Sequence, residues 1–457
     1  MSSHNLSLFD DEQPVPASAS DAVASNPGAP ARVQMPNRNQ FELRATNLDA
    51  QLEDDHRARL VWAYVERLDL SKLYARIRAV EGGVGRTPIA PEILLSLWLY
   101  ATLESMGSAR ALARLCESHD AYRWLCGGVS VNYRTLAAFR VQHDEMLDDL
   151  LSMSVARLAV AGVITMKRVA HDGIRVRASA GVSSLRRRVR LESMLTDAHK
   201  HVAALKAEME SDPSALSRRT QAARERAAQE RERKITAALN ALPELEEIKL
   251  KQVGRGKKKV SEARASTTDA DARLMKMPNG GYNAALNAQI CTDTQTQVIV
   301  GVDVTNAGVD QGQLCPMIDQ LQRRYDRYPD EYLVDGGFVT REQITVAEKK
   351  VRVYAPVPDN RKSKLRPFDP RPTDSPEMAT WRARMGSEAA QELYKQRAST
   401  AECVNAIARE RGLTRLTVRG IKKARCVVML FALAHNLMRT VALAPTLLST
   451  PLAKMAH

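Results

Sequence analysis

The sequence predicts an α/β protein in which an all-helical N-terminal part precedes a mixed sheet of five strands. Two observations lead to this expectation. From about residue 43 to residue 164, apolar residues recur at intervals of three and four, which is the spacing of amphipathic helices. After residue 166, short apolar runs typical of strands alternate with helical segments. A chain of 457 residues with 44% hydrophobic residues is long enough for two or three cores.

The two ends of the chain carry little predicted structure. Residues 1–40 are rich in Ser, Ala, Pro and Asn and lack the basic-then-apolar order of a signal peptide, so we expect a disordered lead-in. The longest apolar run near the other end, Cys426–Met438, contains His435 and Asn436 and is too short and too polar to span a bilayer. We therefore expect a soluble, cytoplasmic, nucleoid-associated protein with no membrane partner, and a short tail at residues 446–457.

The helical domain is predicted to span residues 41–165. Pro88 and Pro91 precede a long apolar helix, and three shorter helices follow, separated by tight turns. Side chains that can cap these three helices come directly before them. The expected helices and their caps are 93–103, then Ser108 with a helix to Leu115, Ser118 or His119 with a helix to Gly127, and Asn132 or Thr135 with a helix to His143.

Short helices with tight turns suit a helix-turn-helix that binds DNA. Arg134 and Arg140 lie on the third short segment and are the candidates for contacts to phosphates or base edges in a major groove. The alternative, which the pattern leaves open, is an all-helical bundle whose arginines are only solvated.

The second domain is expected at residues 166–445. In chain order, strands are predicted at 166–176, 284–292, 297–305, 331–334 and 351–357, with helices at 311–325 and 340–350. Three strands, a helix, a strand, a helix and a strand form the order of a ribonuclease-H-like domain.

Two insertions interrupt that order. The first, residues 185–262, is highly charged and is predicted to form a helical hairpin broken at Asp212-Pro213. Its basic clusters are Arg186, Arg187 and Arg188 at one end and Lys257, Lys258 and Lys259 at the other, and we consider either DNA contact or a solvated face. The second insertion, residues 358–387, is predicted to be a basic loop without a core of its own.

The charge balance and the cysteines restrict the class of protein. A formal net charge of +14 indicates an anionic partner, and nucleic acid is the first candidate. The six cysteines include no Cys-x-x-Cys pair, which fits reduced thiols better than a disulfide framework or a zinc ribbon.

Three stretches place an acidic residue where a strand gives way to a loop or on a late helix. The first two are 168–175, which contains Asp172, and 331–338, which contains Asp335; in both, an apolar run ends in Asp-Gly. The third is 394–402, which ends in Glu402. An Asp before Gly is by itself more often a turn former than a catalytic group. Three carboxylates in one pocket, however, can hold two magnesium ions that stabilise the attacking and leaving oxygens of a phosphodiester displacement.

Several motifs, in order along most of the chain, resemble one family. They are Arg86-Thr-Pro-Ile-Ala-Pro91, the run from Tyr122 to Tyr133, His171-Asp-Gly, the run from Thr268 to Lys276, Gly281-Tyr-Asn-Ala and Val418-Arg-Gly-Ile-Lys. This set resembles the bacterial insertion-sequence transposases of the DDE type, in the insertion sequence 1182 group, from about residue 41 to residue 441. The resemblance implies metal-dependent strand cleavage and strand transfer, with two Mg²⁺ (or Mn²⁺) ions, and a homo-oligomer in the active complex.

The resemblance also implies that Asp172, Asp335 and Glu402 are the metal-binding catalytic triad. Related transposases carry a Tyr, Arg and Glu signature with three residues between Arg and Glu, but here four residues separate Arg397 from Glu402. On one uninterrupted α-helix, five positions rotate a side chain by about 140°, so the two groups would not share a face. Either a new helix begins after Arg397 or the signature is used differently, with Glu410 as the alternative third acid.

Side chains near the third acid are expected to contact DNA. The candidates are Tyr394 and the cations Arg397, Arg409 and Lys422, whose charge would neutralise phosphates. Asp269, Asp271 and Asp303 are expected to form turns or caps. The predicted function is a transposase that binds the terminal inverted repeats of its element and joins them to target DNA. The alternatives are a catalytically inactive DNA-binding regulator derived from a transposase and a ribonuclease-H-like nuclease.

Overall fold

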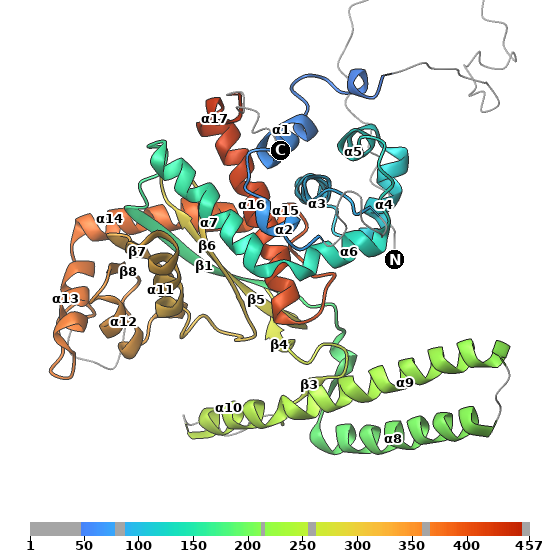
Figure 1. The fold of residues 1–457 in the computed structure, drawn as a ribbon. Coiled ribbons are helices and arrows are strands. Elements are labelled where there is room, and N and C mark those ends of the chain that lie inside the picture. The colour runs from blue at the N-terminus through green and yellow to red at the C-terminus, as the bar shows by residue number, and fades with distance from the viewer. Residues whose placement is uncertain (1–46, 78–86, 212–214, 255–261, 359–365, 450–457) are drawn as a thin grey trace, which may run out of the picture. The chain divides into compact units, whose positions relative to one another are not determined.

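The computed structural model describes residues 47–77, 87–211, 215–254, 262–358 and 366–449. Seven helices form the N-terminal part (Figure 1). Their bounds are α1 (Arg57–Val65), α2 (Ser71–Tyr74), α3 (Pro91–Leu103), α4 (Ala109–Ser118), α5 (Asp120–Cys126), α6 (Tyr133–Gln142) and α7 (Asp144–Val160).

The expected caps of the three short helices are confirmed. Ser108 Oγ accepts a hydrogen bond from the backbone N–H of Ala111, and Asn132 Oδ1 accepts from the backbone N–H groups of Arg134 and Thr135. His119 Nδ1 accepts from the backbone N–H of Ala121. Each cap satisfies backbone donors that the first turn of a helix leaves unpaired.

The five predicted strands are present in one mixed sheet, which a short extra strand extends (Figure 1). The order across the sheet is β6, β5, β1, β7, β8, and β4 pairs with the start of β5. Strand β5 runs antiparallel to both of its neighbours, β6 and β1, whereas β7 and β8 run parallel to β1. The bounds are β1 (Arg168–Arg177), β4 (Arg273–Lys276), β5 (Tyr282–Asp293), β6 (Ile299–Thr305), β7 (Glu331–Leu333) and β8 (Arg352–Tyr354).

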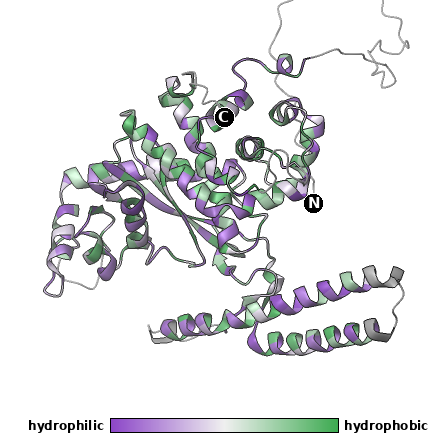
Figure 2. Cartoon of the chain, in the orientation of Figure 1, coloured by the Kyte–Doolittle hydropathy of each residue, from purple (hydrophilic) through white to green (hydrophobic). Residues whose placement is uncertain are grey.

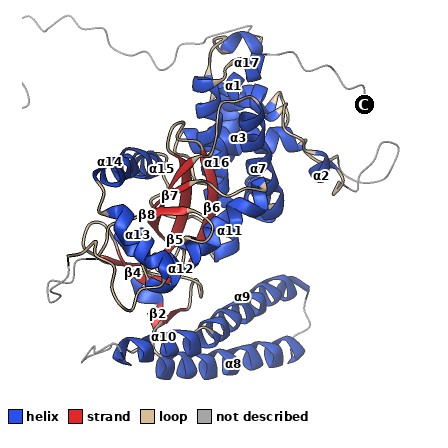
Figure 3. Cartoon of the chain, turned by 90° about the vertical axis from the view of Figure 1, so that its left-hand side faces the viewer, coloured by secondary structure: helices blue, strands red, loops and turns tan. Residues whose placement is uncertain are grey.

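Helices cover both faces of this sheet (Figure 3). On one face, α11 (Leu314–Tyr325), α12 (Arg341–Ala347) and α13 (Pro376–Met385) contribute to a core that includes Tyr332 and Val353. On the other face lies α16 (Ile421–Leu443), which contacts α3, α6, α7 and β6. The remaining C-terminal elements are α14 (Glu388–Arg397), a π-helical segment (Ala398–Glu402), α15 (Cys403–Glu410) and α17 (Thr446–Ser449).

The N-terminal helices do not have a separate core. Buried residues of α3, such as Leu95 and Leu99, belong to the same cluster as Leu430 of α16 and Ile174 of β1. The described residues from Asn47 onward accordingly form one unit. The predicted boundary at residue 165 therefore marks a change from helices to strands, but the buried apolar surface is continuous across it. A long-range contact of this kind has no signature in local periodicity.

Helix α16 is longer than the apolar run Cys426–Met438 that was judged too short to span a bilayer. By length and composition its 23 residues would suffice to cross a membrane, with a mean hydropathy of 1.7 in the most apolar window. In the structure 67% of that window is buried inside the protein. Arg425 of the same helix forms ion pairs with Asp144 and Asp148 of α7. These contacts are those of a central core helix.

Between β1 and β4 the chain forms a pair of long helices, α8 (Arg188–Ser211) and α9 (Ala215–Asn240), followed by α10 (Leu242–Gly254). The apolar spacing predicted these helices, and Leu191 and Ile235 pack together between them. Figure 2 shows that hydrophilic residues cover much of the rest of both helices. A two-stranded pairing of β2 (Leu185–Arg186) with β3 (Ala265–Ser266) closes the base of this hairpin.

The prediction of a coreless loop at residues 358–387 was wrong for its second half. Residues 376–385 form α13, whose N-cap is Ser375, and Trp381 on this helix is fully buried. Arg382 is also buried and pairs with Asp374 at 2.7 Å. The sequence did not predict this short helix, because the segment is rich in prolines and arginines and only three of its apolar residues, Met378, Trp381 and Met385, belong to the core.

Candidate active site

The site begins with two neighbouring parallel strands. In the register of β1 with β7, Ala170 lies beside Leu333. Asp172 and Asp335 each follow two residues later, so the two carboxylates lie at equivalent positions on strands that are about 4.8 Å apart. The two Asp-Gly motifs are thus adjacent in space, although 163 positions separate Asp172 from Asp335 in the sequence. The hydrogen-bonded pair Arg168 and Glu331, on the same two strands, has the same separation.

Asp172 is held by groups on both sides. Its Oδ1 accepts a hydrogen bond from the backbone N–H of Gly173 at 2.9 Å, and its Oδ2 accepts from Asn405 Nδ2 at 3.0 Å. Burial raises the pKa of Asp172 to about 6, while the charge of Arg397 opposes this rise and the charge of Asp335 adds to it. Burial makes the charged form of this carboxylate unfavourable, so a nearby cation stabilises that form strongly.

Asp335 caps a short helical turn. Its Oδ1 accepts from the backbone N–H of Gly337 at 2.8 Å, and the turn is anchored by Phe338, which is fully buried. The Asp335 side chain is 40% exposed. This residue therefore has the turn-forming role that its Asp-Gly sequence suggests, and its second carboxylate oxygen, Oδ2, faces Arg397.

Arg397 lies between all three predicted acids. Its Nη2 is 3.2 Å from Asp172 Oδ2 and 3.9 Å from Asp335 Oδ2, and its Nη1 is 3.4 Å from Glu402 Oε1. The Arg397 side chain is only 12% exposed. Three carboxylates from β1, the loop after β7 and the π-helical segment thus converge on one guanidinium group.

A π-helical segment resolves the spacing between Arg397 and Glu402. The segment comprises the five residues from Ala398 to Glu402 and joins α14 to α15. In a π-helix each backbone hydrogen bond spans five residues instead of four, so one extra residue fits within the turn. Thr400 is buried at the centre of the segment, and its Oγ1 donates to the carbonyl of Gln396 at 2.8 Å. From the sequence, either a new helix would begin after Arg397 or the signature would be used differently. The π-helical segment makes neither alternative necessary, because it keeps Arg397 and Glu402 in contact.

The contacts among the described residues favour Glu402 over Glu410 as the third acid. Glu402 contacts Arg397, whereas Glu410 is exposed at the end of α15 and its backbone carbonyl accepts from Ser105. Tyr394, also predicted at the site, is half-buried on α14, and burial raises its pKa.

Sequence reasoning missed Asn405 and Asp310. Asn405 follows Glu402 by three positions, a spacing that places both on one helix face, and this signal was available. Asp310 lies over Gly173, where an added Cβ would come within 2.1 Å of Asp310 Oδ1. Asn287 and Gln289, both fully buried, each donate to Asp310 Oδ1 at 2.8 Å. Glycine at position 173 is therefore required by close packing.

The donor chemistry of the three acids fits a hard divalent cation, since Mg²⁺ prefers carboxylate oxygens. Within the described ranges, however, no three Asp, Glu, His or Cys side chains are arranged as a ready metal site. The guanidinium of Arg397 supplies the positive charge at the point where the carboxylates meet. Metal binding at these residues thus requires that Arg397 move.

The predicted DNA-contacting residues have different environments. Arg134 is exposed on α6 and lies over the ring of Tyr133 at 5.9 Å. Arg187 pairs with Glu262 and Arg188 with Glu246, both at the base of the hairpin. Arg186, Arg409 and Lys422 are exposed, and Lys257, Lys258 and Lys259 lie outside the described residues.

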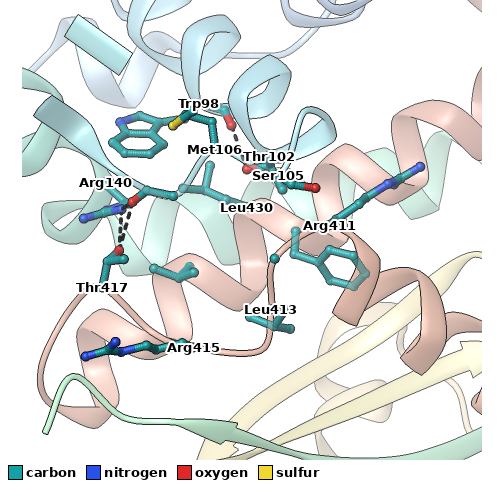
Figure 4. A pocket seen from close by; sticks show the side chains of 14 residues that line it. Trp98, Thr102, Ser105, Met106, Arg140, Arg411, Leu413, Arg415, Thr417 and Leu430 are labelled. Atoms are coloured by element: carbon teal, nitrogen blue, oxygen red, sulfur yellow. Dashed lines mark hydrogen bonds between the residues drawn. The ribbon is translucent and has the colours of Figure 1, made fainter. Parts of the chain in front are cut away.

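Arg140 differs from the prediction because its side chain is turned inward. It is 7% exposed, lies over the ring of Trp98 at 4.5 Å, and donates to Gly107 O at 2.6 Å and to Thr417 Oγ1 at 3.0 Å. Figure 4 shows it at one side of a cavity of about 60 Å³ beside these groups. Its partner Thr417 is distant in sequence, so position on a predicted helix could not reveal the burial.

Two of the acidic residues outside the triad have the capping role that was expected. Asp269 Oδ2 accepts from the backbone N–H of Gly420 at 3.1 Å, and Asp271 Oδ2 accepts from that of Ile421 at 2.9 Å. Both thus cap the N-terminus of α16, where negative charge is favourable.

Comparison with known proteins finds two regions of the chain that match transposase families. Residues 46–142 match the family described as "Transposase domain (DUF772)", and residues 360–441 match the family described as "Transposase DDE domain". The second match includes Arg397, Glu402 and Asn405, whereas Asp172 and Asp335 lie between the two matched regions. No curated protein and no solved structure matches the chain. The two matches support a transposase of the DDE type.

Proposed function

We propose that this protein is a DNA transposase that binds the terminal inverted repeats of its mobile element and carries out metal-dependent strand cleavage and transfer to target DNA. The observation that carries the proposal is the convergence of Asp172, Asp335 and Glu402 on Arg397. The two matched transposase domains support it, and the order of the sequence motifs supports the insertion sequence 1182 group.

The sheet supports a ribonuclease-H-like catalytic domain as part of this proposal. In the sheet order β6, β5, β1, β7, β8, strand β5 is antiparallel to both of its neighbours, and β7 and β8 are parallel to β1. This arrangement agrees with that assignment. In it, the helical hairpin between β1 and β4 is an insertion, and Glu402 lies after the fifth main strand.

In the proposed reaction, Asp172, Asp335 and Glu402 are the residues that would hold a divalent metal. DDE transposases generally use divalent metals, and two such ions would stabilise the attacking and leaving oxygens of the phosphodiester. Asn405 and the backbone N–H of Gly173 fix the Asp172 carboxylate in orientation. Arg397 balances the carboxylates in the absence of metal, and once displaced its guanidinium is free to contact a phosphate.

The proposed DNA contacts come from side chains near the site and on the helices. The exposed cations that we retain are Arg134, Arg186, Arg409 and Lys422. We also retain Tyr394 and Arg397, which lie at the site, and Lys257, Lys258 and Lys259, which lie outside the described residues. Arg187 and Arg188 would have to exchange their glutamate partners for phosphates. Arg140 is not included, because its burial and its contacts with Trp98 and Thr417 give it a structural role. A homo-oligomer acting on nucleoid DNA in the cytoplasm completes the proposal.

The test uses the full chain and the DNA that flanks its own gene. Labelled duplexes from either side of the gene, with Mg²⁺, are expected to be cut at one end of an inverted repeat and joined to a second DNA. Cleavage without joining would indicate a ribonuclease-H-like nuclease. Tight binding without cleavage would indicate an inactive regulator, and absence of both would overturn the proposal.

A further inference from the structure

A groove lined by arginines lies close to the candidate active site. Its volume is about 460 Å³. Arg175 and Arg177 of β1, Arg409 of α15 and Arg415 of the following loop all line it, and the turn between β4 and β5 completes the wall. Only Arg409 among these was a candidate from the sequence, since the four are brought together by three different elements.

The local structure explains how the arginines come together. After α15 the chain passes alongside the end of β1: the backbone N–H of Arg177 donates to Thr414 O at 3.0 Å, and that of Leu416 donates to Arg177 O at 2.7 Å. This pairing is parallel and places Arg415 beside Arg177. Arg175 donates from Nη1 to the carbonyl of Lys276 at 3.0 Å, which fixes it against the β4–β5 turn.

The groove has no acidic residue to balance these charges. No Asp or Glu lines it, and none of the four arginines forms an ion pair with a carboxylate in the described part of the chain. Other arginines of this protein are paired, for example Arg187 with Glu262 and Arg425 with Asp144. Four clustered and unpaired cations repel one another, so an anionic partner would stabilise them.

The groove continues from the two elements that carry acids of the triad. Arg175 follows Asp172 by three positions on β1, a backbone rise of about 10 Å at 3.3 Å per residue, and its side chain lies on the opposite face of the strand because strand side chains alternate. Arg409 follows Glu402 by seven positions along a helix, which is again about 10 Å at 1.5 Å per residue and keeps both side chains on one face. The proximity of the groove to the acids therefore rests on α15, from Glu402 to Arg409.

We propose that this groove binds the sugar–phosphate backbone of duplex DNA next to the phosphate that is cleaved. The inference rests on the proposed function and specifies how its DNA is held. Arg175, Arg177, Arg409 and Arg415 contact phosphates, and no aromatic ring lines the groove to stack on a base. The contacts are consequently independent of sequence, so the groove positions the DNA and does not read it.

The test measures the affinity of the full-length protein over a salt series for two short labelled duplexes of different arbitrary sequence and for one of their single strands. The variant carries Arg177→Gln and Arg415→Gln, two exposed positions. The matched control carries Arg323→Gln and Arg327→Gln, two exposed arginines just before β7, at the opposite end of that strand from Asp335. Each variant removes the same charge.

The groove variant is expected to bind about tenfold more weakly at low salt, and the slope of log affinity against log salt should fall by about two units. The control should bind as the wild type does, apart from the small general effect of lost charge. A groove variant that matches its control would overturn the proposal, as would a loss confined to one DNA sequence. A larger loss on single strands than on duplex would also contradict it.

Failure of this proposal is distinguishable from failure of the proposed function. If the wild-type protein cuts and joins DNA but the groove variant binds like the control, the groove alone is rejected. If the wild-type protein neither binds nor cuts DNA, the transposase assignment is rejected together with it.

Discussion

Arg397 Nη1 lies 3.4 Å from Glu402 Oε1, although an α-helix would turn side chains five positions apart to different faces. The π-helical segment from Ala398 to Glu402 makes this contact possible by adding a residue to one turn. Such segments are frequent at functional sites, because they change the direction of a side chain while the helices on either side remain packed. Here the effect is to bring the third acid to the other two.

The position of Arg397 predicts a competition between its guanidinium and a metal ion. Arg397→Gln should lower the melting temperature of the metal-free protein, because three converging carboxylates lose their shared cation. Magnesium should then bind the variant about tenfold more tightly than it binds the wild type, and should raise its melting temperature by more. Thermal unfolding with and without Mg²⁺ measures both effects.

Arg425→Gln is the control for that experiment. Arg425 also pairs with three carboxylates, but these are Asp144 and Asp148 of α7 and Asp303 of β6, none of which belongs to the triad. This variant should be destabilised and yet respond to magnesium as the wild type does. Equal magnesium shifts for Arg397→Gln and the wild type would show that the guanidinium does not occupy the metal position.

Because Trp381 of α13 is fully buried, we expect its substitution to reduce stability strongly, although the composition of this segment suggested a loop. Trp381→Ala should lower the free energy of unfolding by about 3–5 kcal/mol, the range for removing a fully buried aromatic side chain. Trp381→Phe should cost much less, because the indole Nε1 has no hydrogen-bond partner among the described residues. Denaturant unfolding would compare the two, and a nearly neutral Trp381→Ala would mean that the segment does not pack on the core.

Two buried histidines predict that stability depends on pH. Burial lowers the pKa of His435 to about 4, although its hydrogen bond with Gln297 O opposes the shift, and burial also lowers the pKa of His171 to about 4. The unfolded chain takes up these protons near pH 6.5, so stability is full above that pH and falls as the pH decreases toward 4. Each histidine accounts for roughly 2 kcal/mol between about pH 6.5 and about pH 5.

His435→Gln tests this dependence at a position outside the candidate site. The variant should lose less stability than the wild type when urea unfolding at about pH 7.5 is compared with unfolding at about pH 5. An identical loss in both proteins would show that His435 takes up a proton without unfolding.

The sequence was most informative where structure is local. Short apolar runs predicted the five main strands, and the side chains of Ser108 and Asn132 predicted where α4 and α6 begin. It was least informative where contacts join distant segments. Burial of Arg140 depends on Thr417, and the common core of α3 and α16 has no local signature.

In the candidate site, too, the sequence predicted local features but not contacts between distant segments. Asp-Gly after an apolar run predicted Asp172 and Asp335, whereas Asp310 approaches Gly173 only through contacts with β5. The π-helical turn was also beyond local reasoning. Its extra residue was visible in the sequence as a spacing that differs from the related signature, but the helical hydrogen bonds that accommodate it depend on the burial of Thr400 and Ala401.

The most direct test of the proposed active site is magnesium-dependent cleavage of the terminal-repeat DNA by four purified variants. Asp172→Asn, Asp335→Asn and Glu402→Gln preserve side-chain volume and remove the charge that would hold the metal, so each should still fold and bind DNA but produce no detectable cleavage. Glu410→Gln, eight positions after Glu402 and exposed, should cleave at the wild-type rate. Cleavage near the wild-type rate by any of the first three variants, or its loss in Glu410→Gln alone, would contradict the proposed triad.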